Sequence, residues 1–260
     1  MKPLAVQTLG PENGLQVVLL HGFLSDSRQW QDLTTRVQKL TKPPIRWILP
    51  DLPGHGQSPD FPPSPDWTEL VEQLEIVVQG QFVLGGYSLG GRIAAVWAHL
   101  KPQRIQALWL ESAQPPLEPE DVAHRREVDE LRAYMLETSS LADFVDMWAH
   151  LPLFASQKKL AKDVLEQQKQ LRLAQDPLGL AQSLRWYGSA NMPQDLQLSM
   201  DTHFLLGELD TGVASRVHAW QARAPRLQVT RVPKIGHAIH LEAPEIAAKH
   251  LADLLNQLHT

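Results

Sequence analysis

Short apolar runs recur along the chain, and most of them end in glycine or polar residues. These runs occupy residues 16–20, 45–50, 82–84, 105–110, 204–206 and 227–232. Their length and bounding residues predict buried strands. Between several of them the apolar residues recur at helical spacing, as in residues 67–79 and 244–258. Strands that alternate with helices predict an α/β fold, with a mainly parallel sheet covered by helices on both faces.

Residues 115 to about 195 interrupt this alternation. They contain no convincing strand, and their apolar pattern predicts helices over residues 121–136, 141–148, 157–173 and 178–186. Prolines punctuate both ends, at Pro115-Pro116 and at Asn191-Met192-Pro193. We therefore predict a core of residues 1–114 and 196–260, with residues 115–195 inserted as a helical lid. Such a lid would cover the carboxyl ends of the strands, where open α/β sheets bind ligands.

Composition narrows the classes of function. The 260 residues suit one large domain with an insertion. A net charge of -5 gives no reason to expect nucleic acid or an anionic membrane as a partner. The chain has no cysteine, which excludes disulfides, thiolate catalysis and cysteine zinc sites. The sequence shows no apparent signal peptide or membrane-spanning segment, so we expect a cytoplasmic protein. It also shows no metal-ligand cluster and no phosphate-binding loop, so we expect no metal or cofactor. We expect a monomer or a weak homo-oligomer.

The stretch Gly86-Tyr87-Ser88-Leu89-Gly90 lies between a predicted strand and an apolar, helix-like segment. Glycines two positions before and after the serine allow a sharp bend without a Cβ clash. The bend would lift the Ser88 hydroxyl out of the sheet and leave the next backbone N–H free for an oxyanion. This strand, turn and helix are typical of the nucleophile elbow, so we predict an α/β-hydrolase fold.

A catalytic serine needs an imidazole that takes its proton and a carboxylate that orients the imidazole. In this fold the chain order is serine, acid, histidine. Asp210 and His237 each follow a predicted strand in that order, so we predict a triad of Ser88, Asp210 and His237. Glu208 is the rival acid and His240 the rival histidine. Asp210 could also cap the helix that follows it.

The loop after the first predicted strand begins His21-Gly22-Phe23. The backbone N–H groups of Phe23 and Leu89 are suitably placed to form an oxyanion hole. A second loop, Asp51–Ser58, is also typical of the fold. We expect a structural role for that loop, and for the histidines His21 and His55.

Arg92 follows Ser88 by four residues, which is one helical turn and therefore the same side of the helix. No acid stands at the neighbouring helical positions, so this cation favours an anionic ligand; an ion pair with a lid or loop carboxylate is the alternative. The predicted lid adds Arg125, Arg126, Arg132, Arg172 and Arg185. Asp121 is spaced to pair with Arg125, and Glu130 with Arg126. The arginines together nevertheless suggest a polycarboxylate substrate, because arginine binds carboxylates bidentately.

At these residues a resemblance becomes specific. The stretches that carry it are Gly86–Arg92, His21–Phe23 with Trp30, Asp51–Gly56 and Pro152–Ser156. Together they resemble the 2-succinyl-6-hydroxy-2,4-cyclohexadiene-1-carboxylate synthases of menaquinone biosynthesis, over nearly the whole chain. The resemblance implies a lyase that eliminates pyruvate from 2-succinyl-5-enolpyruvyl-6-hydroxy-3-cyclohexene-1-carboxylate.

The same resemblance implies roles for the triad and the amides. Ser88 would be the base, relayed through His237, while Asp210 stabilises the imidazolium and no acyl-enzyme forms. The Phe23 and Leu89 amides would hold the enolate-like oxygen that develops on the succinyl ketone.

It also implies contacts to the three carboxylates of the substrate. Arg92 corresponds to the family's elbow arginine, and Arg126 and Arg172 to its two lid arginines; an alignment shifted by one residue would replace Arg126. Tyr87 and Trp148 fall at substrate-contact positions, although each could equally be a packing residue.

Two other functions stay open on the sequence. The same triad could act covalently, in a carboxylesterase, a thioesterase or a C–C bond hydrolase. A binding protein could also keep the fold without its chemistry. The arginines argue for the lyase, and the complete set of triad residues argues for an enzyme.

Overall fold

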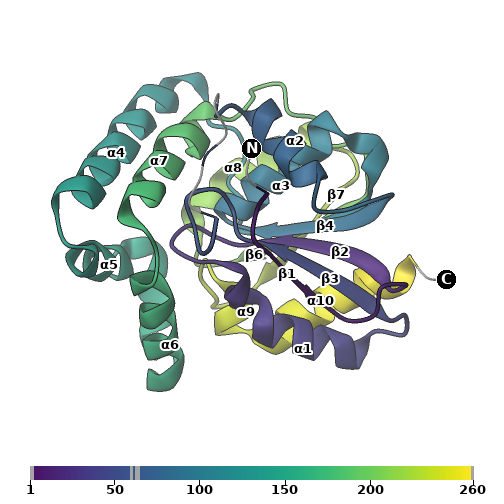
Figure 1. Ribbon diagram of the computed structural model, residues 1–260. Coiled ribbons are helices and arrows are strands. Elements are labelled where there is room, and N and C mark those ends of the chain that lie inside the picture. Colours follow the sequence, from purple (N-terminus) through teal and green to yellow (C-terminus); the bar gives the residue numbers. More distant parts are fainter. Residues whose placement is uncertain (1–2, 59–60, 62–64, 259–260) are drawn as a thin grey trace.

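The computed structural model describes residues 3–58, 61 and 65–258. Seven strands form one sheet in the order β1-β3-β2-β4-β5-β6-β7. Their bounds are β1 Val6–Leu9, β2 Leu15–Leu20, β3 Ile45–Pro50, β4 Phe82–Tyr87, β5 Ile105–Glu111, β6 Thr202–Gly207 and β7 Leu227–Val232. Only β1 runs antiparallel to its neighbour; every other pair is parallel. The carboxyl ends of the parallel strands therefore gather at one edge of the sheet (Figure 1).

Helices cover both faces of the sheet (Figure 1). On one face lie α2 Trp67–Glu75, α3 Leu89–Leu100 and α8 Thr211–Arg223. On the other lie α1 Gln31–Leu40, α9 Ile239–Glu242 and α10 Pro244–Gln257. Neighbouring residues of a strand point to opposite faces, so Leu108 and Leu110 pack on the first face and Trp109 on the second.

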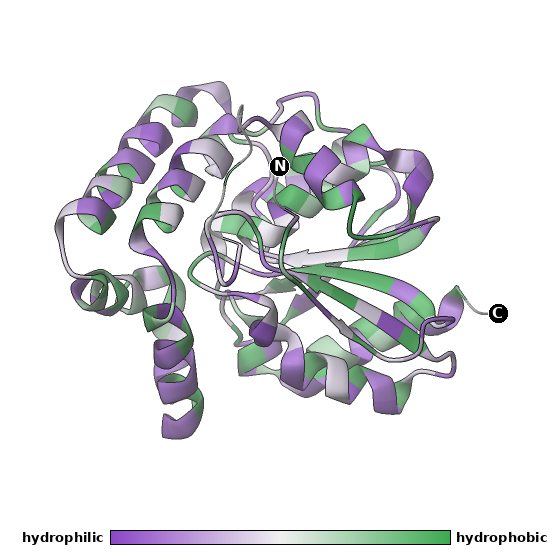
Figure 2. Ribbon diagram, in the orientation of Figure 1, coloured by the Kyte–Doolittle hydropathy of each residue, from purple (hydrophilic) through white to green (hydrophobic). Residues whose placement is uncertain are grey.

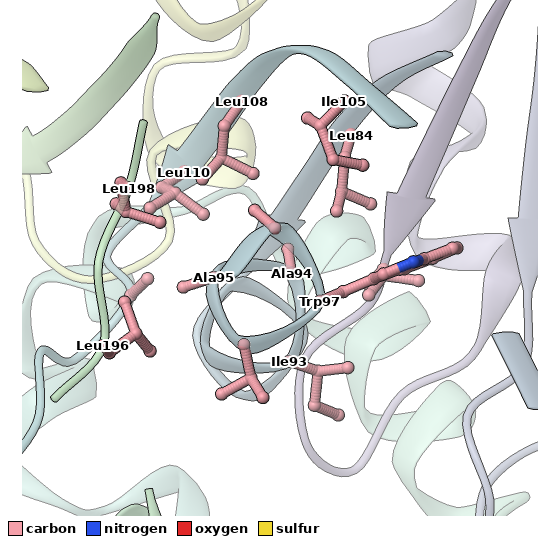
Figure 3. Packing of buried hydrophobic residues seen from close by; sticks show 14 of the residues in the cluster. Leu84, Ile93, Ala94, Ala95, Trp97, Ile105, Leu108, Leu110, Leu196 and Leu198 are labelled. Carbon is pink, nitrogen blue, oxygen red and sulfur yellow. The ribbon is translucent and has the colours of Figure 1, made fainter. Parts of the chain in front are cut away.

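The core beneath α3 is densely aliphatic. Figure 3 shows Ala94 and Ala95 of this helix beside Leu108 and Leu110 of β5, whereas Trp97 points away from these leucines. Figure 2 shows the strands as mainly hydrophobic, while hydrophilic residues are frequent on the outer helices. Burial of both sheet faces explains why the sequence shows continuous apolar runs and not the alternation of a half-exposed strand.

Four helices follow one another between β5 and β6. They are α4 Pro119–Thr138, α5 Leu141–Ala149, α6 Lys162–Leu173 and α7 Pro177–Tyr187, with a 3-10 segment at Pro152–Lys159. Figure 1 shows them to one side of the sheet, beyond the loops at its carboxyl edge. They share a separate apolar cluster that includes Phe144, Trp148 and Leu180. The division at residues 114/115 and 195/196 remains our proposal, and residues 1 and 260 of the predicted core lie outside the described part of the chain.

The predicted strands and helices are present, with small differences at their ends. β4 and β6 are longer than predicted, and α2 ends at Glu75 instead of residue 79. The predicted helix 157–173 was wrong at its start, because residues up to 159 form the 3-10 segment. No helix in the described ranges is long and apolar enough to cross a membrane.

Candidate active site

Ser88 occupies the tight turn between β4 and α3. Its backbone has φ 51° and ψ -111°, a conformation that L-residues rarely adopt. The neighbouring glycines make this turn possible, because a Cβ at Gly86 would overlap the Gly90 backbone and a Cβ at Gly90 would overlap the carbonyl oxygens of Leu20 and His21. The result is a serine raised at the carboxyl edge of the sheet, with α3 packed tightly behind it.

The structure brings Ser88, His237 and Asp210 into one hydrogen-bonded row. His237 Nε2 lies 2.9 Å from Ser88 Oγ, and His237 Nδ1 lies 2.6 Å from Asp210 Oδ2. Asp210 also caps α8, because its Oδ1 accepts the N–H of Val213 at 3.4 Å. Both the histidine and the carboxylate are buried. The Nδ1 contact makes this nitrogen the donor to the carboxylate, which leaves Nε2 free to accept the serine proton.

The rival residues from the sequence occupy other positions. Glu208 is exposed, and its carboxylate accepts the backbone N–H of Lys234 at 2.8 Å. His240 is buried, and its Nδ1 lies 2.7 Å from Glu111 Oε1, in a pair separate from Asp210. The geometry therefore supports Asp210 and His237 as the partners of Ser88.

The two predicted oxyanion amides belong to neighbouring segments. Leu89 is the first residue of α3, so its N–H has no partner inside the helix. Phe23 follows β2, in a loop held by His21, whose Nδ1 lies 2.8 Å from the Gly22 carbonyl and whose Nε2 accepts the Leu52 N–H at 2.9 Å. Burial lowers the pKa of His21, so the ring stays neutral and keeps both contacts. The expected structural role of His21 agrees with these contacts.

A cavity of about 280 Å³ lies between the strand ends and the inserted helices, and Ser88, His237 and Asp210 line it. Four arginines also line it: Arg92, Arg125, Arg132 and Arg172. So many cations around one cavity favour a ligand with several negative charges.

Arg92 and Arg172 have no ion pair with any described carboxylate. Arg92 is 9% exposed, makes one long hydrogen bond of 3.4 Å to the Tyr187 carbonyl, and has a buried Nε without a partner. Burial, with Arg125 as a second cause, lowers the pKa of Arg92 to about 9, so the guanidinium is still charged at pH 7. The guanidinium of Arg172 lies 5.5 Å from the centre of the Phe154 ring, and burial lowers its pKa also. The alternative of an ion pair for Arg92 is therefore not supported.

The remaining lid arginines differ from the prediction. Arg126 does not line the cavity; it is exposed and lies 3.4 Å from Asn191 Oδ1. Arg125 lines the cavity in its place and pairs with Asp129 at 2.8 Å. Arg132 was not singled out as a ligand contact, but it too lines the cavity, 3.7 Å from Asp129 and 5.2 Å from the centre of the Trp148 ring.

The pairs expected along α4 were wrong as well. Asp121 pairs with Arg216 at 2.7 Å, and Glu130 pairs with Arg185 at 2.8 Å. Both acids therefore turn to neighbouring helices, and the basic groups that face the cavity are not neutralised by them.

Aromatic rings form much of the cavity wall. Tyr87 and Trp148, the two predicted substrate contacts, line it. Each is also packed: the Tyr87 ring lies 5.2 Å from His237 and 4.7 Å from His240, and Trp148 lies 5.0 Å from the Phe23 ring. The two readings of these positions are thus compatible. The sequence did not identify Phe154 as a site residue, although its ring lies 5.9 Å from His237.

Gln157 also lines the cavity and was not identified. Its buried Nε2 has no hydrogen-bond partner in the described structure, so it adds a further free donor. The sequence pattern could not identify Gln157, because no periodic signal distinguishes one functional glutamine in a 3-10 segment from any other glutamine. The described residues contain no group of three or more histidine, aspartate or glutamate side chains that could hold a metal ion.

Comparison with known proteins agrees with this fold. Residues 17–249 match the alpha/beta hydrolase family. The structure of MenH from S. aureus superimposes with a TM-score of 0.87 at 28% identity, over 98% of this chain and 99% of that one. A thermophilic esterase from Thermogutta terrifontis, solved with malate bound, has a TM-score of 0.79 at 27% identity, over 98% of this chain and 94% of that one.

Two curated relatives carry the name of one synthase. A Bacillus subtilis (strain 168) protein, provisionally named 2-succinyl-6-hydroxy-2,4-cyclohexadiene-1-carboxylate synthase, is 31% identical over 98% of this chain and 95% of its own length. A synthase of that name from Enterobacter sp. (strain 638) is 30% identical over 92% of this chain and 91% of its own length. The chain therefore belongs to the alpha/beta hydrolase family and, within it, to the 2-succinyl-6-hydroxy-2,4-cyclohexadiene-1-carboxylate synthases.

Proposed function

We propose that this protein converts 2-succinyl-5-enolpyruvyl-6-hydroxy-3-cyclohexene-1-carboxylate to 2-succinyl-6-hydroxy-2,4-cyclohexadiene-1-carboxylate and pyruvate, in menaquinone biosynthesis. One observation carries this proposal: a serine, histidine and aspartate in hydrogen-bond contact face a cavity in which Arg92 and Arg172 have no ion pair with any carboxylate of the described residues. A substrate with three carboxylates would neutralise these cations, whereas the acyl chain of an ordinary ester would leave them unpaired.

In the proposed reaction Ser88 Oγ removes a proton from the ring while its own proton passes to His237 Nε2, 2.9 Å away. The electron pair of the broken C–H bond shifts through the ring, and the bond between the ring and the enolpyruvyl oxygen breaks. The leaving group takes up a proton and becomes pyruvate. Asp210 stabilises the imidazolium, because its carboxylate contacts Nδ1 at 2.6 Å.

The backbone amides of Phe23 and Leu89 would bind the oxygen of the succinyl ketone. Negative charge develops on that oxygen when the ring proton is removed, and two fixed N–H donors stabilise it. Arg92, Arg125, Arg132 and Arg172 would bind the carboxylates. Arg125 replaces Arg126 in this proposal, since Arg126 does not line the cavity.

The direct test supplies the enolpyruvyl substrate and follows pyruvate with lactate dehydrogenase and NADH. We expect stoichiometric pyruvate without any added metal or cofactor. If no pyruvate forms and the protein cleaves p-nitrophenyl esters instead, the lyase proposal is wrong and a covalent hydrolase takes its place.

A further inference from the structure

A second pair of histidine and carboxylate lies beside the triad. His240 is in α9, three residues after His237. Its backbone N–H donates to Glu111 Oε1 at 3.1 Å, and its Nδ1 lies 2.7 Å from the same oxygen. Glu111 is the last residue of β5 and is fully buried. The pair is thus held by two contacts to one atom at the carboxyl edge of the sheet.

The ring of His240 is fixed on its sides as well. Its centre lies 4.7 Å from that of Tyr87 and 5.4 Å from that of Trp30. His240 lines the same cavity as Ser88. None of the described residues makes a hydrogen bond with its Nε2. His240 Nε2 is therefore the unpartnered nitrogen of a cavity-lining ring whose side chain is 2% exposed.

The contacts decide which ring nitrogen carries the proton. Glu111 Oε1 already accepts the backbone N–H of His240, so it acts as an acceptor for Nδ1 also. A neutral imidazole that donates from Nδ1 has a lone pair on Nε2. In this tautomer His240 presents a hydrogen-bond acceptor to the cavity.

The unpartnered polar groups of this cavity include the hydroxyls of Ser112, Ser183 and Tyr187, each of which can donate or accept. Arg92 and Gln157 present donors, which suit carboxylate, ketone and ether oxygens. In the substrate proposed above, the ionised carboxylates, the ketone and the ether oxygen can only accept. The hydroxyl on the ring is the single O–H donor of that molecule. A ring nitrogen that can only accept suits this one donor.

We propose that His240 Nε2, positioned by Glu111, accepts a hydrogen bond from the ring hydroxyl of the substrate and thereby selects the orientation of the ring. This inference rests on the proposed function. It adds a residue that distinguishes a ring with the hydroxyl from a ring without it. Glu111 acts through His240 as a positioning residue.

Two ligands that differ in the hydroxyl provide the test. One is the product, 2-succinyl-6-hydroxy-2,4-cyclohexadiene-1-carboxylate. The other is 2-succinylbenzoate, the aromatic compound that the product becomes by loss of water; it keeps both carboxylates and lacks the hydroxyl. Calorimetry gives the Kd of each for the wild type and for His240→Asn, whose amide can still donate to Glu111 but has no atom at the Nε2 position.

We expect His240→Asn to weaken product binding about tenfold, as one hydrogen bond is lost, and to change 2-succinylbenzoate binding less than twofold. His240→Gln, which can place an amide oxygen near the Nε2 position, should retain more of the product affinity. The exposed His218→Asn serves as the control and should alter neither Kd. Equal weakening of both ligands by His240→Asn would overturn the proposal, because His240 would then be structural or a carboxylate ligand.

A second measurement needs no variant. In wild-type protein with 15N-labelled histidine, the product should shift the Nε2 resonance of His240 and 2-succinylbenzoate should not; equal shifts contradict the inference. These outcomes differ from failure of the proposed function, in which the wild type releases no pyruvate from the enolpyruvyl substrate.

Discussion

A guanidinium that lies inside a protein without a carboxylate is costly unless a ligand supplies the charge. Within the described part of the chain Arg92 and Arg172 are in this situation, whereas Arg125 and Arg132 share Asp129. The two pairs of arginines should therefore differ in their contribution to ligand binding. Replacement of an unpaired arginine does not leave a carboxylate of the protein without its partner. The effect of such a replacement on substrate binding is therefore separate from its effect on folding.

We expect Arg92→Ala to lower kcat/KM for the anionic substrate by about 10- to 100-fold, the effect of a hydrogen bond to a charged group. The thermal midpoint should not fall, because a desolvated cation is removed. The control is Arg231→Ala, an exposed arginine on β7. A loss of kcat/KM that is equally large for a neutral ester would argue against a carboxylate contact.

Ser88→Ala tests the proposed base. The change removes Oγ, which is 2.9 Å from His237, and leaves the packing of α3 intact. We expect turnover to fall by about 10³-fold or more while the far-ultraviolet dichroism spectrum stays unchanged. Pyruvate release within tenfold of the wild-type rate would show that His237 removes the ring proton without the serine.

At the residue scale, the sequence identified the site residues whose positions follow from helical spacing or from their place after a strand. Ser88 and Arg92 are separated by one helical turn, and each triad residue follows a strand. The prediction for Arg126 differs from the structure for a geometric reason. Neighbouring residues of a helix point about 100° apart, so a shift of one residue turns a side chain from the cavity to the solvent. Gln157 and His240 Nε2 could not be identified as site groups from the sequence, because a sequence does not show which polar atoms have hydrogen-bond partners.

At the scale of elements, the site depends on how closely α3 approaches the end of β2. Gly90 permits this approach, because a Cβ there would meet the carbonyl oxygens of Leu20 and His21. The buried parallel strands were predictable because their apolar runs are continuous. The edge strand β1 was missed, since it has four residues and two of them are exposed. Helix α1 was also missed, because its apolar face is narrow, with Leu33 and Val37 as its buried apolar residues.

Gly90→Ala should disturb this contact. Its Cβ would overlap backbone oxygens of Leu20 and His21, which cannot rotate away as a side chain can. We expect a loss of about 1–3 kcal/mol in the free energy of unfolding, measured with urea, together with reduced activity. Gly212→Ala in α8 is the matched control, because a Cβ there meets nothing within 4 Å. It should be neutral or stabilising by up to about 1 kcal/mol.

At the scale of the whole molecule, several histidines are buried in neutral form. Burial lowers the pKa of His55 to about 3 and that of His250 to about 4; in both cases a neighbouring histidine adds to the lowering. In the unfolded chain both would titrate near pH 6.5. Below that pH the unfolded state binds more protons than the folded state, so acid favours unfolding.

We therefore expect the stability of the protein to fall as the pH is lowered from 7 to 5. Each of these two histidines should contribute a loss of about 2 kcal/mol over this interval. Urea midpoints at several pH values measure the effect, and replacement of His55 by asparagine should reduce the slope. A stability that is constant between pH 7 and pH 5 would mean that the two rings are protonated in the folded protein.

The four helices between β5 and β6 have a further consequence. Ser88, Asp210 and His237 lie in the loops that follow strands of the sheet, whereas every arginine of the cavity except Arg92 comes from this one continuous stretch of chain. The triad and most of the cavity arginines thus come from separate segments of the sequence. We expect exchange of that inserted segment between relatives to change which anions bind, and the strands that precede the triad residues would need no change in register.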